Sequence, residues 1–290
     1  MRNCLKANRG EEMTMMGMDW RARRFGNMAS RCAIIAAALA GLGACEGLPG
    51  SAKSTAGTGD APAASDAAKP SEVDPQLKLA AMQAEAQNNY LEAAQHYQSL
   101  LSRDPDNLDL ALGLTRNLRF AGSTPQDIDI LNQLIAKHGR TPRLLTELGK
   151  SYVSSDQMNL AVPILQEATS LEGATWDSFS TLGVAFDYQG QYDRAREEYT
   201  QALLLSPRNP DVLNNLALSQ AQSGDLDGAI ETLGQATDQA SATPQTRQNL
   251  ALLLALKGDT AGAERLARKD LPKDMADLNA DYYRYLAGTK

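Results

Sequence analysis

The sequence predicts an all-α fold, a solenoid of about six helix-turn-helix repeats closed by a C-terminal helix. Three observations predict it. A pattern of apolar and small residues returns every 34 residues between Asp74 and about Asp277. Between the two helices of every unit stands a residue type that tolerates left-handed backbone. After the last unit, apolar residues continue at helical spacing.

The repeat keeps one register throughout. Position 1 falls at Asp74, Leu108, Pro142, Trp176, Pro210 and Pro244. Position 8, where the two helices of a unit cross, is small, at Ala81, Thr115, Gly149, Gly183, Ala217 and Ala251. Position 15 carries turn residues, at Asn88, Gly122, Asp156, Gly190, Gly224 and Gly258. Position 20 is small and apolar in every unit but the second, where it is Asp127. We therefore expect close helix pairs joined by tight turns.

The fourth unit, 176–209, resembles a tetratricopeptide repeat. The residues that match the family pattern are Leu182, Gly183, Phe186, Gly190, Tyr192, Ala195, Tyr199, Ala202 and Pro207. The resemblance implies a right-handed superhelical solenoid over 74–271. The second unit departs from the pattern at Pro125 and Asp127, but remains helical by periodicity.

The segment 272–290 is interpreted as a C-terminal capping helix and tail. Its helical stripe consists of Leu271, Met275, Leu278, Tyr282, Tyr285 and Leu286. The end of a repeat stack needs a cover, so the tyrosines Tyr282, Tyr283 and Tyr285 are assigned to packing of this cap. An interface in a homo-oligomer is the alternative.

The front of the chain is a different kind of segment. Several arginines precede an apolar run over 32–42, which ends in Leu42-Gly43-Ala44-Cys45. This order predicts a lipoprotein signal peptide over 1–44, with the true start possible at a later methionine, and its last four residues resemble a bacterial lipobox. Cys45 would then receive the lipid, and 45–73, poor in large apolar residues, would be a disordered linker. The cytoplasmic alternative, with three free thiols, leaves the apolar run unexplained.

Charge and composition narrow the function. The whole chain carries a net charge of −7, and removal of 1–44, with seven of its 28 Lys and Arg and three of its 35 Asp and Glu, leaves −11. Such acidity argues against nucleic acid. The only histidines, His96 and His138, lack partners at metal or nucleophile spacing, and no phosphate loop is present. We expect no enzyme, no metal and no cofactor. A hidden enzyme would need ionisable residues that converge in a pocket.

In tetratricopeptide repeats the first helices line a concave groove, which predicts a site for protein partners. Mapped onto this chain, the candidate groove residues are Arg116, Arg119, Arg143, Lys150, Tyr188, Asn214, Asn215, Gln248 and Asn249. The four cations would offer a seat for a partner's carboxylates, and the asparagines would bond a peptide backbone.

The C-terminal part resembles one branch of the superfamily. Segments 214–218, 243–252, 263–272 and 282–286 are similar to the TadD family, tetratricopeptide lipoproteins of Tad (Flp) pilus assembly. The resemblance implies a lipid-anchored scaffold on the periplasmic face of the outer membrane, which helps the Tad secretin or another pilus component to assemble. A periplasmic adaptor for a protease or a peptidoglycan enzyme would use the same parts and is the alternative.

Overall fold

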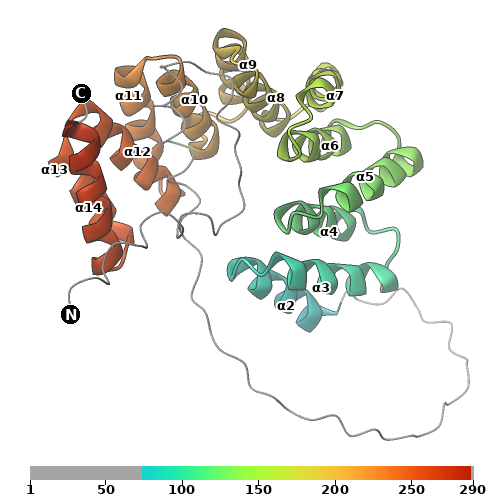
Figure 1. Cartoon of the computed structure of the whole chain (residues 1–290). Coiled ribbons are helices and arrows are strands. Elements are labelled where there is room, and N and C mark those ends of the chain that lie inside the picture. Colours follow the sequence, from blue (N-terminus) through green and yellow to red (C-terminus); the bar gives the residue numbers. More distant parts are fainter. Residues whose placement is uncertain (1–73, 289–290) are drawn as a thin grey trace, which may run out of the picture. The chain divides into compact units, whose positions relative to one another are not determined.

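A computed structural model describes residues 74–288, which form thirteen α-helices and no strand. The helices follow one another in antiparallel pairs from α2–α3 to α12–α13, and α14 closes the series (Figure 1). The predicted all-α superhelical repeat fold is confirmed. Within these residues no helix is both long enough and apolar enough to cross a membrane.

Each repeat contributes a first and a second helix. The first helices are α2 (Pro75–Ala86), α4 (Leu108–Phe120), α6 (Pro142–Ser154), α8 (Trp176–Tyr188), α10 (Pro210–Gln222) and α12 (Pro244–Lys257). The second helices are α3 (Tyr90–Arg103), α5 (Thr124–His138), α7 (Met158–Ser170), α9 (Tyr192–Leu205), α11 (Leu226–Thr237) and α13 (Thr260–Asp270). The closing helix α14 spans Lys273–Gly288 and buries Ala276, Ala280, Tyr283 and Leu286. Leu278 and Tyr285, which the sequence assigned to the covering stripe, are instead each 64% exposed, because the helix turns a neighbouring face toward the last repeat.

Five of the six first helices, all but α8, begin at a side chain that caps the first turn, and four of them begin with a proline. Thr243 accepts a hydrogen bond from the amide of Thr246 at 3.2 Å, and Asn209 accepts from Asp211 and Val212. A side chain of this kind satisfies amides that the first turn leaves unpaired. Proline follows the cap directly in α2, α6, α10 and α12, where its missing N–H costs nothing. Local chemistry thus helps to fix where the five capped helices start.

The predicted turns are confirmed in all six units. Every position-15 residue has positive φ, from 57° at Asn88 to 103° at Gly258. Two of the six are not glycine, but asparagine and aspartate are the L-residues that adopt this conformation most readily.

Close approach at position 8 is also confirmed. A Cβ placed on Gly183 would lie 2.7 Å from a ring carbon of Tyr199, and one on Gly149 would lie 2.4 Å from a methyl of Leu165. Tyr199 and Leu165 are fully buried, so the core fills the space that these glycines leave. The two helices of a repeat therefore share one tightly packed apolar layer.

The first helices lie on the inner side of the curvature. Successive first helices contact one another from α4 to α12, whereas no two second helices within 74–288 share a comparable contact. Elements that lie closer together in a curved stack are on its concave side. The first helices consequently line the groove, as the family resemblance implied.

Candidate partner-binding groove

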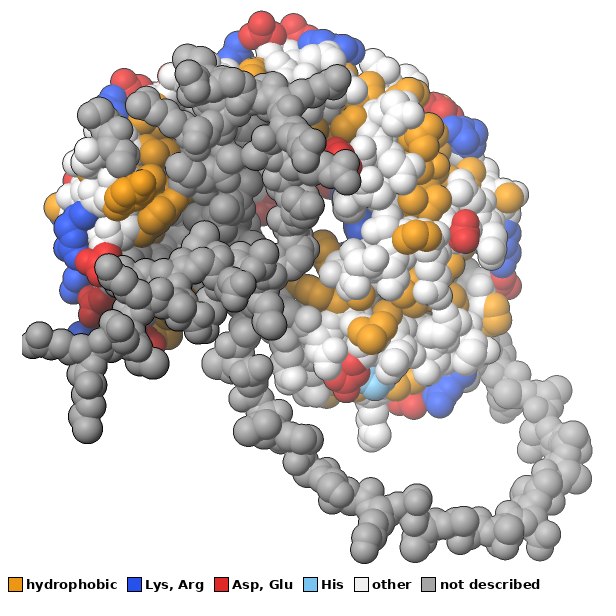
Figure 2. All heavy atoms as spheres, in the orientation of Figure 1, with side chains coloured by type: hydrophobic (Ala, Val, Ile, Leu, Met, Phe, Trp, Pro, Cys, Tyr) orange, Lys and Arg blue, Asp and Glu red, His pale blue; other side chains and the backbone are white. Residues whose placement is uncertain are grey.

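The groove has a charged half and an uncharged half. The first helices α2, α4 and α6 carry both acidic and basic side chains, and α8 carries Asp177 and Asp187. The polar side chains of α10 and α12 are mainly Asn, Gln, Ser and Thr. On the face shown in Figure 2, Lys and Arg side chains lie beside Asp and Glu rather than in patches of one sign. The two halves differ in what they could bind.

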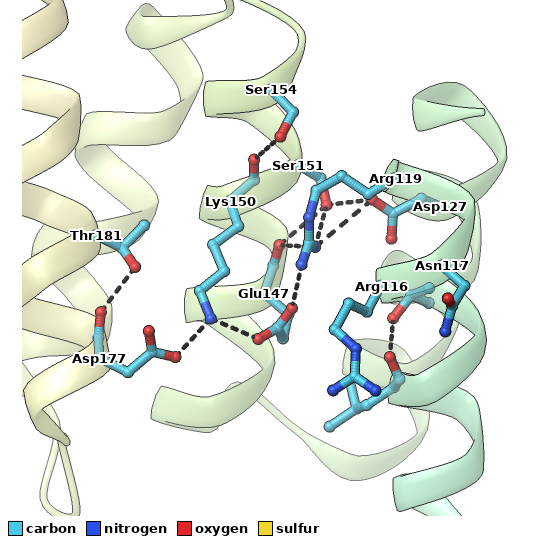
Figure 3. A network of polar contacts seen from close by, with 12 residues as sticks. Arg116, Asn117, Arg119, Asp127, Glu147, Lys150, Ser151, Ser154, Asp177 and Thr181 are labelled. Atoms are coloured by element: carbon cyan, nitrogen blue, oxygen red, sulfur yellow. Dashed lines mark hydrogen bonds and ion pairs between the residues drawn. The ribbon is translucent and has the colours of Figure 1, made fainter. Parts of the chain in front are cut away.

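In the charged half, Arg119 is the centre of a buried network (Figure 3). Its guanidinium donates to Glu147 Oε2 at 2.9 Å and to Ser151 Oγ at 3.3 Å, and its Nη1 lies 3.9 Å from Asp127 Oδ2. Ser151 donates to the same Asp127 carboxylate. Asp127, which the repeat pattern marks as an exception at a small apolar position, is thus fully buried against a cation and a hydroxyl.

The same network continues into the next repeat through Lys150. Its ammonium group lies 2.8 Å from Glu147 and 2.6 Å from Asp177, so Glu147 bridges two cations (Figure 3). Burial tends to raise the pKa of Glu147, but Lys150 and Arg119 outweigh that effect and hold the pKa below its usual value. For Asp127 burial dominates instead, and its pKa rises to about 6 in spite of Ser151 and Arg119.

The two remaining predicted cations are paired as well. Arg116 donates to Glu85 at 2.8 Å, and Arg143 donates to Asp109 at 2.6 Å. From the sequence, all four cations were expected to be available to a partner's carboxylates. The structure corrects this, because every one of them already has a carboxylate of this chain, supplied in each case by a neighbouring repeat. A partner's carboxylate would have to displace it.

Side chains at repeat position 10 link neighbouring units in the same way several times. Asn117 donates to Glu85 at 2.6 Å, and Ser219 donates to Asp187 at 2.6 Å. Asp187 also accepts from Tyr199 Oη at 2.7 Å, and burial raises its pKa to about 6. These bonds fix the orientation of one repeat relative to the next, which keeps the groove in one shape.

In the uncharged half, asparagines form a comparable link between repeats. Asn249 is buried and donates to Asn214 Oδ1 at 2.7 Å, and Asn215 donates to Ser180 Oγ at 3.2 Å. Within residues 74–288, the side-chain amide nitrogen of Asn214 and the side-chain carbonyl oxygen of Asn215 make no further hydrogen bond. A donor and an acceptor on adjacent residues complement the C=O and N–H of one peptide group.

Asn214 and Asn215 line a pocket of about 250 Å³ between α10 and α12. The other lining residues are Asp211, Thr243, Gln245 and Thr246. None of these four residues was predicted from the sequence to belong to the site. Asp211 and Gln245 occupy groove position 2 and could have been predicted from the register, whereas Thr243 and Thr246 belong to the N-terminal cap of α12, which the register does not assign to the groove.

Of the other predicted site residues, two lie outside the pocket between α10 and α12 and one is not described. Both amide atoms of Gln248 are inaccessible to solvent, and this side chain lies beside Asp270, whose pKa it helps Arg247 to lower. Gln248 therefore does not face the groove, contrary to the prediction. Tyr188 is half exposed at the end of α8, away from the asparagine pocket. Cys45 lies outside the described residues.

Comparisons with known proteins agree with the repeat pattern. Two models described as tetratricopeptide repeat match residues 76–107 and 180–245. The comparison with curated proteins gives no match. No cluster of His, Cys, Asp and Glu within 74–288 is arranged to hold a metal ion.

Solved structures share the fold. A thermophilic tetratricopeptide repeat protein of Thermus thermophilus is 20% identical with a TM-score of 0.57, over 62% of this chain and 98% of that one. One from Parabacteroides merdae is 14% identical with a TM-score of 0.57, over 72% and 83%. The Pseudomonas aeruginosa pilF structure is 15% identical with a TM-score of 0.50, over 71% and 96%.

Residues 76–107 and 180–245 thus match tetratricopeptide repeats, and the described part of the chain has the fold of tetratricopeptide repeat proteins. Repeats of this class suggest a scaffold for protein–protein interaction, and such folds are generally not enzymes.

Proposed function

We propose that this protein is a non-enzymatic, lipid-anchored scaffold of Tad (Flp) pilus assembly, whose groove binds an extended segment of a partner protein. The observation that carries the binding role is the pocket between α10 and α12. Its adjacent donor and acceptor, on Asn214 and Asn215, match a peptide group.

The charged half of the groove has a different role in this proposal. Its cations are saturated by Glu85, Asp109, Glu147 and Asp177, so it holds the repeats in place rather than capturing acidic side chains. The partner segment is therefore recognised by backbone hydrogen bonds and shape, next to a single exposed carboxylate at Asp211.

The pilus assignment rests on the C-terminal segments that resemble the TadD family and on the lipobox that ends at Cys45. In this proposal the lipid holds the solenoid at the periplasmic face of the outer membrane, and the linker lets the groove reach the secretin or another pilus component. Tethering raises the local concentration of the partner without any new contact.

The groove is tested first, with Gln245→Arg in the full chain. Gln245 is exposed at the rim of the pocket, so the larger side chain blocks the pocket without disturbing the core. We expect at least a tenfold loss of binding to the secretin's periplasmic segments in pull-downs. Gln201→Arg, on the exposed face of α9, is the matched control and leaves binding unchanged. Equal binding by both variants would exclude the pocket as the binding site.

The pilus role is tested in cells. The amount and membrane location of assembled Tad secretin are compared with the chain present, absent, and carrying Cys45→Ala. Loss or mislocalisation of secretin oligomers without the chain, with no rescue by the unlipidated form, is the expected result. Normal secretin in all three strains would remove this role and favour an adaptor for a periplasmic enzyme.

A further inference from the structure

The pocket between α10 and α12 contains one charged side chain, and none of its lining residues is basic. This side chain, Asp211, is exposed, and within residues 74–288 its carboxylate forms no ion pair and no hydrogen bond. Only its backbone amide is engaged, as a donor to Asn209. Arg208, three residues earlier in the chain, does not line the pocket and forms no ion pair with Asp211. A cation that enters the pocket therefore meets a free carboxylate and otherwise neutral groups.

Other acids at the same repeat position are compensated by this chain. Asp211 occupies position 2, as do Asp109 and Asp177. Asp109 accepts a hydrogen bond at 2.6 Å from Arg143, which lies 34 residues later. Asp177 accepts one at 2.6 Å from Lys150, which lies 27 residues earlier. Two different neighbours thus supply a cation to an acid at position 2.

Neither of these arrangements gives Asp211 a cation. The residue 34 positions later is Gln245, and the residue 27 positions earlier is Val184. The basic side chains of α10 and α12 are Arg247 and Lys257. Arg247 pairs with a carboxylate at the end of α13, and Lys257 pairs with one on α11. Asp211 is therefore an acid of the groove that the neighbouring repeats leave uncompensated.

The carboxylate lies within reach of a segment held by the two asparagines of the pocket. Asn214 and Asn215 follow Asp211 by three and four residues, so the three side chains share one face of α10 and are separated by one helical turn, about 5 Å along the axis. The aliphatic stem of a lysine or arginine is long enough to cover one turn. A basic residue next to the peptide group on Asn214 and Asn215 can therefore bring its cation to Asp211.

We propose that the partner segment carries an arginine or a lysine beside the peptide group that Asn214 and Asn215 bind, and that its cation pairs with Asp211. This inference rests on the groove-binding role proposed above and adds the chemistry of the partner. An acidic segment is disfavoured, because Asp211 repels it and no lining residue compensates the repulsion. The net charge of −7 of the whole chain acts in the same direction.

A single exposed ion pair has limited strength. It selects the segment that binds more than it tightens binding, and it adds only a shallow dependence on ionic strength.

Selection from a phage-displayed library of random linear peptides tests this preference on the full chain. Peptides that bind the unaltered chain but not Gln245→Arg, which fills the pocket, are its ligands. We expect these ligands to share a lysine or arginine at one position, and selection on Asp211→Arg to replace it with aspartate or glutamate. Pocket ligands without a shared basic residue would overturn this inference and leave the groove-binding role intact. Absence of any pocket ligand would overturn both.

Synthetic copies of a selected peptide test whether the charge acts on Asp211 itself. Replacement of the basic residue by a neutral analogue, citrulline for arginine or norleucine for lysine, should weaken binding about fivefold, the upper range for an exposed pair. Asp211→Asn should cause the same loss, and both changes together should cause no more than either alone. Losses that multiply would overturn the pairing with Asp211.

Glu197→Gln is the matched control, because it removes the same charge from an exposed position on α9. Binding should be unchanged in this variant. A loss equal to that of Asp211→Asn would show an effect of net charge alone and would overturn the proposed pair. An unchanged circular dichroism spectrum verifies that each variant is folded.

Discussion

Arg119 stabilises the second and third repeats because it compensates a buried carboxylate, and a double-mutant cycle tests this directly. Its side chain is 6% exposed and lies between Glu147 and the fully buried Asp127. Removal of one partner from a buried charged network costs about 3–5 kcal/mol, because the other charge is left without compensation. We expect Arg119→Ala to lower the free energy of unfolding by that amount at pH 7.5.

Asp127→Ala should restore part of the free energy of unfolding that Arg119→Ala removes. The pKa of Asp127 stands about two units above its usual value, which corresponds to about 3 kcal/mol of destabilisation at pH 7.5. Loss of its hydrogen bond from Ser151 offsets about 1 kcal/mol of this. The double variant should therefore be at least about 1 kcal/mol more stable than Arg119→Ala alone.

Urea unfolding of the full chain, followed by far-ultraviolet circular dichroism, measures both variants. Arg143→Ala is the control, since its ion pair with Asp109 is exposed and contributes little. Free-energy changes for Arg119→Ala and Asp127→Ala that simply add, within about 0.5 kcal/mol, would refute the coupling.

Three further predictions concern other parts of the solenoid. The raised pKa of Asp187, about 6, contributes stability that is present below about pH 4 and lost as the pH rises through 6, so Asp187→Asn should flatten the fall in urea midpoint between pH 5 and pH 7.5. Gly183→Ala should lower the free energy of unfolding by about 1–3 kcal/mol, because the added methyl group clashes with Tyr199. Gly234→Ala in α11, which has open space around it, should raise the free energy of unfolding by up to about 1 kcal/mol. Equal changes in melting temperature for the two variants would contradict this. Asn249→Ala should cost about 1–3 kcal/mol and weaken partner binding, because it removes the hydrogen bond to Asn214 that shapes the pocket. Isothermal titration that shows unchanged affinity would contradict the effect on binding.

The sequence predicted most of the fold because the repeat constrains each position six times. Position 15 illustrates this, since Asn88 and Asp156 fit the turn although glycine is usual there. Asp127 could not be assigned in this way. Position 20 is occupied by a small apolar residue in the other repeats. The partners of Asp127 lie on other helices, Arg119 on α4 of the same repeat and Ser151 on α6 of the next repeat. Whether a charged side chain can be buried depends on its neighbours in space. The repeat register assigns each position separately and does not show these neighbours.

The groove was predicted in part. The repeat register identified side chains that face the groove, but it did not show which acidic side chains of neighbouring repeats are paired with them. Arg116, Arg119 and Arg143 each meet an acid 28 to 34 residues away, which is close to one repeat length. A comparison of charges between neighbouring repeats would have revealed these pairs. Gln248 was misassigned because α14 and the end of α13 cover that side of α12.

The internal pairing of the groove's charges has a consequence for solution conditions. Each cation from Arg116 to Lys150 brings its own counter-charge from a neighbouring repeat, so partner binding should release few ions. Affinity should then change little with ionic strength. The exposed pairs, such as Arg116 with Glu85 and Arg143 with Asp109, are instead screened by salt, so that ionic strength acts on the rigidity of the first three repeats.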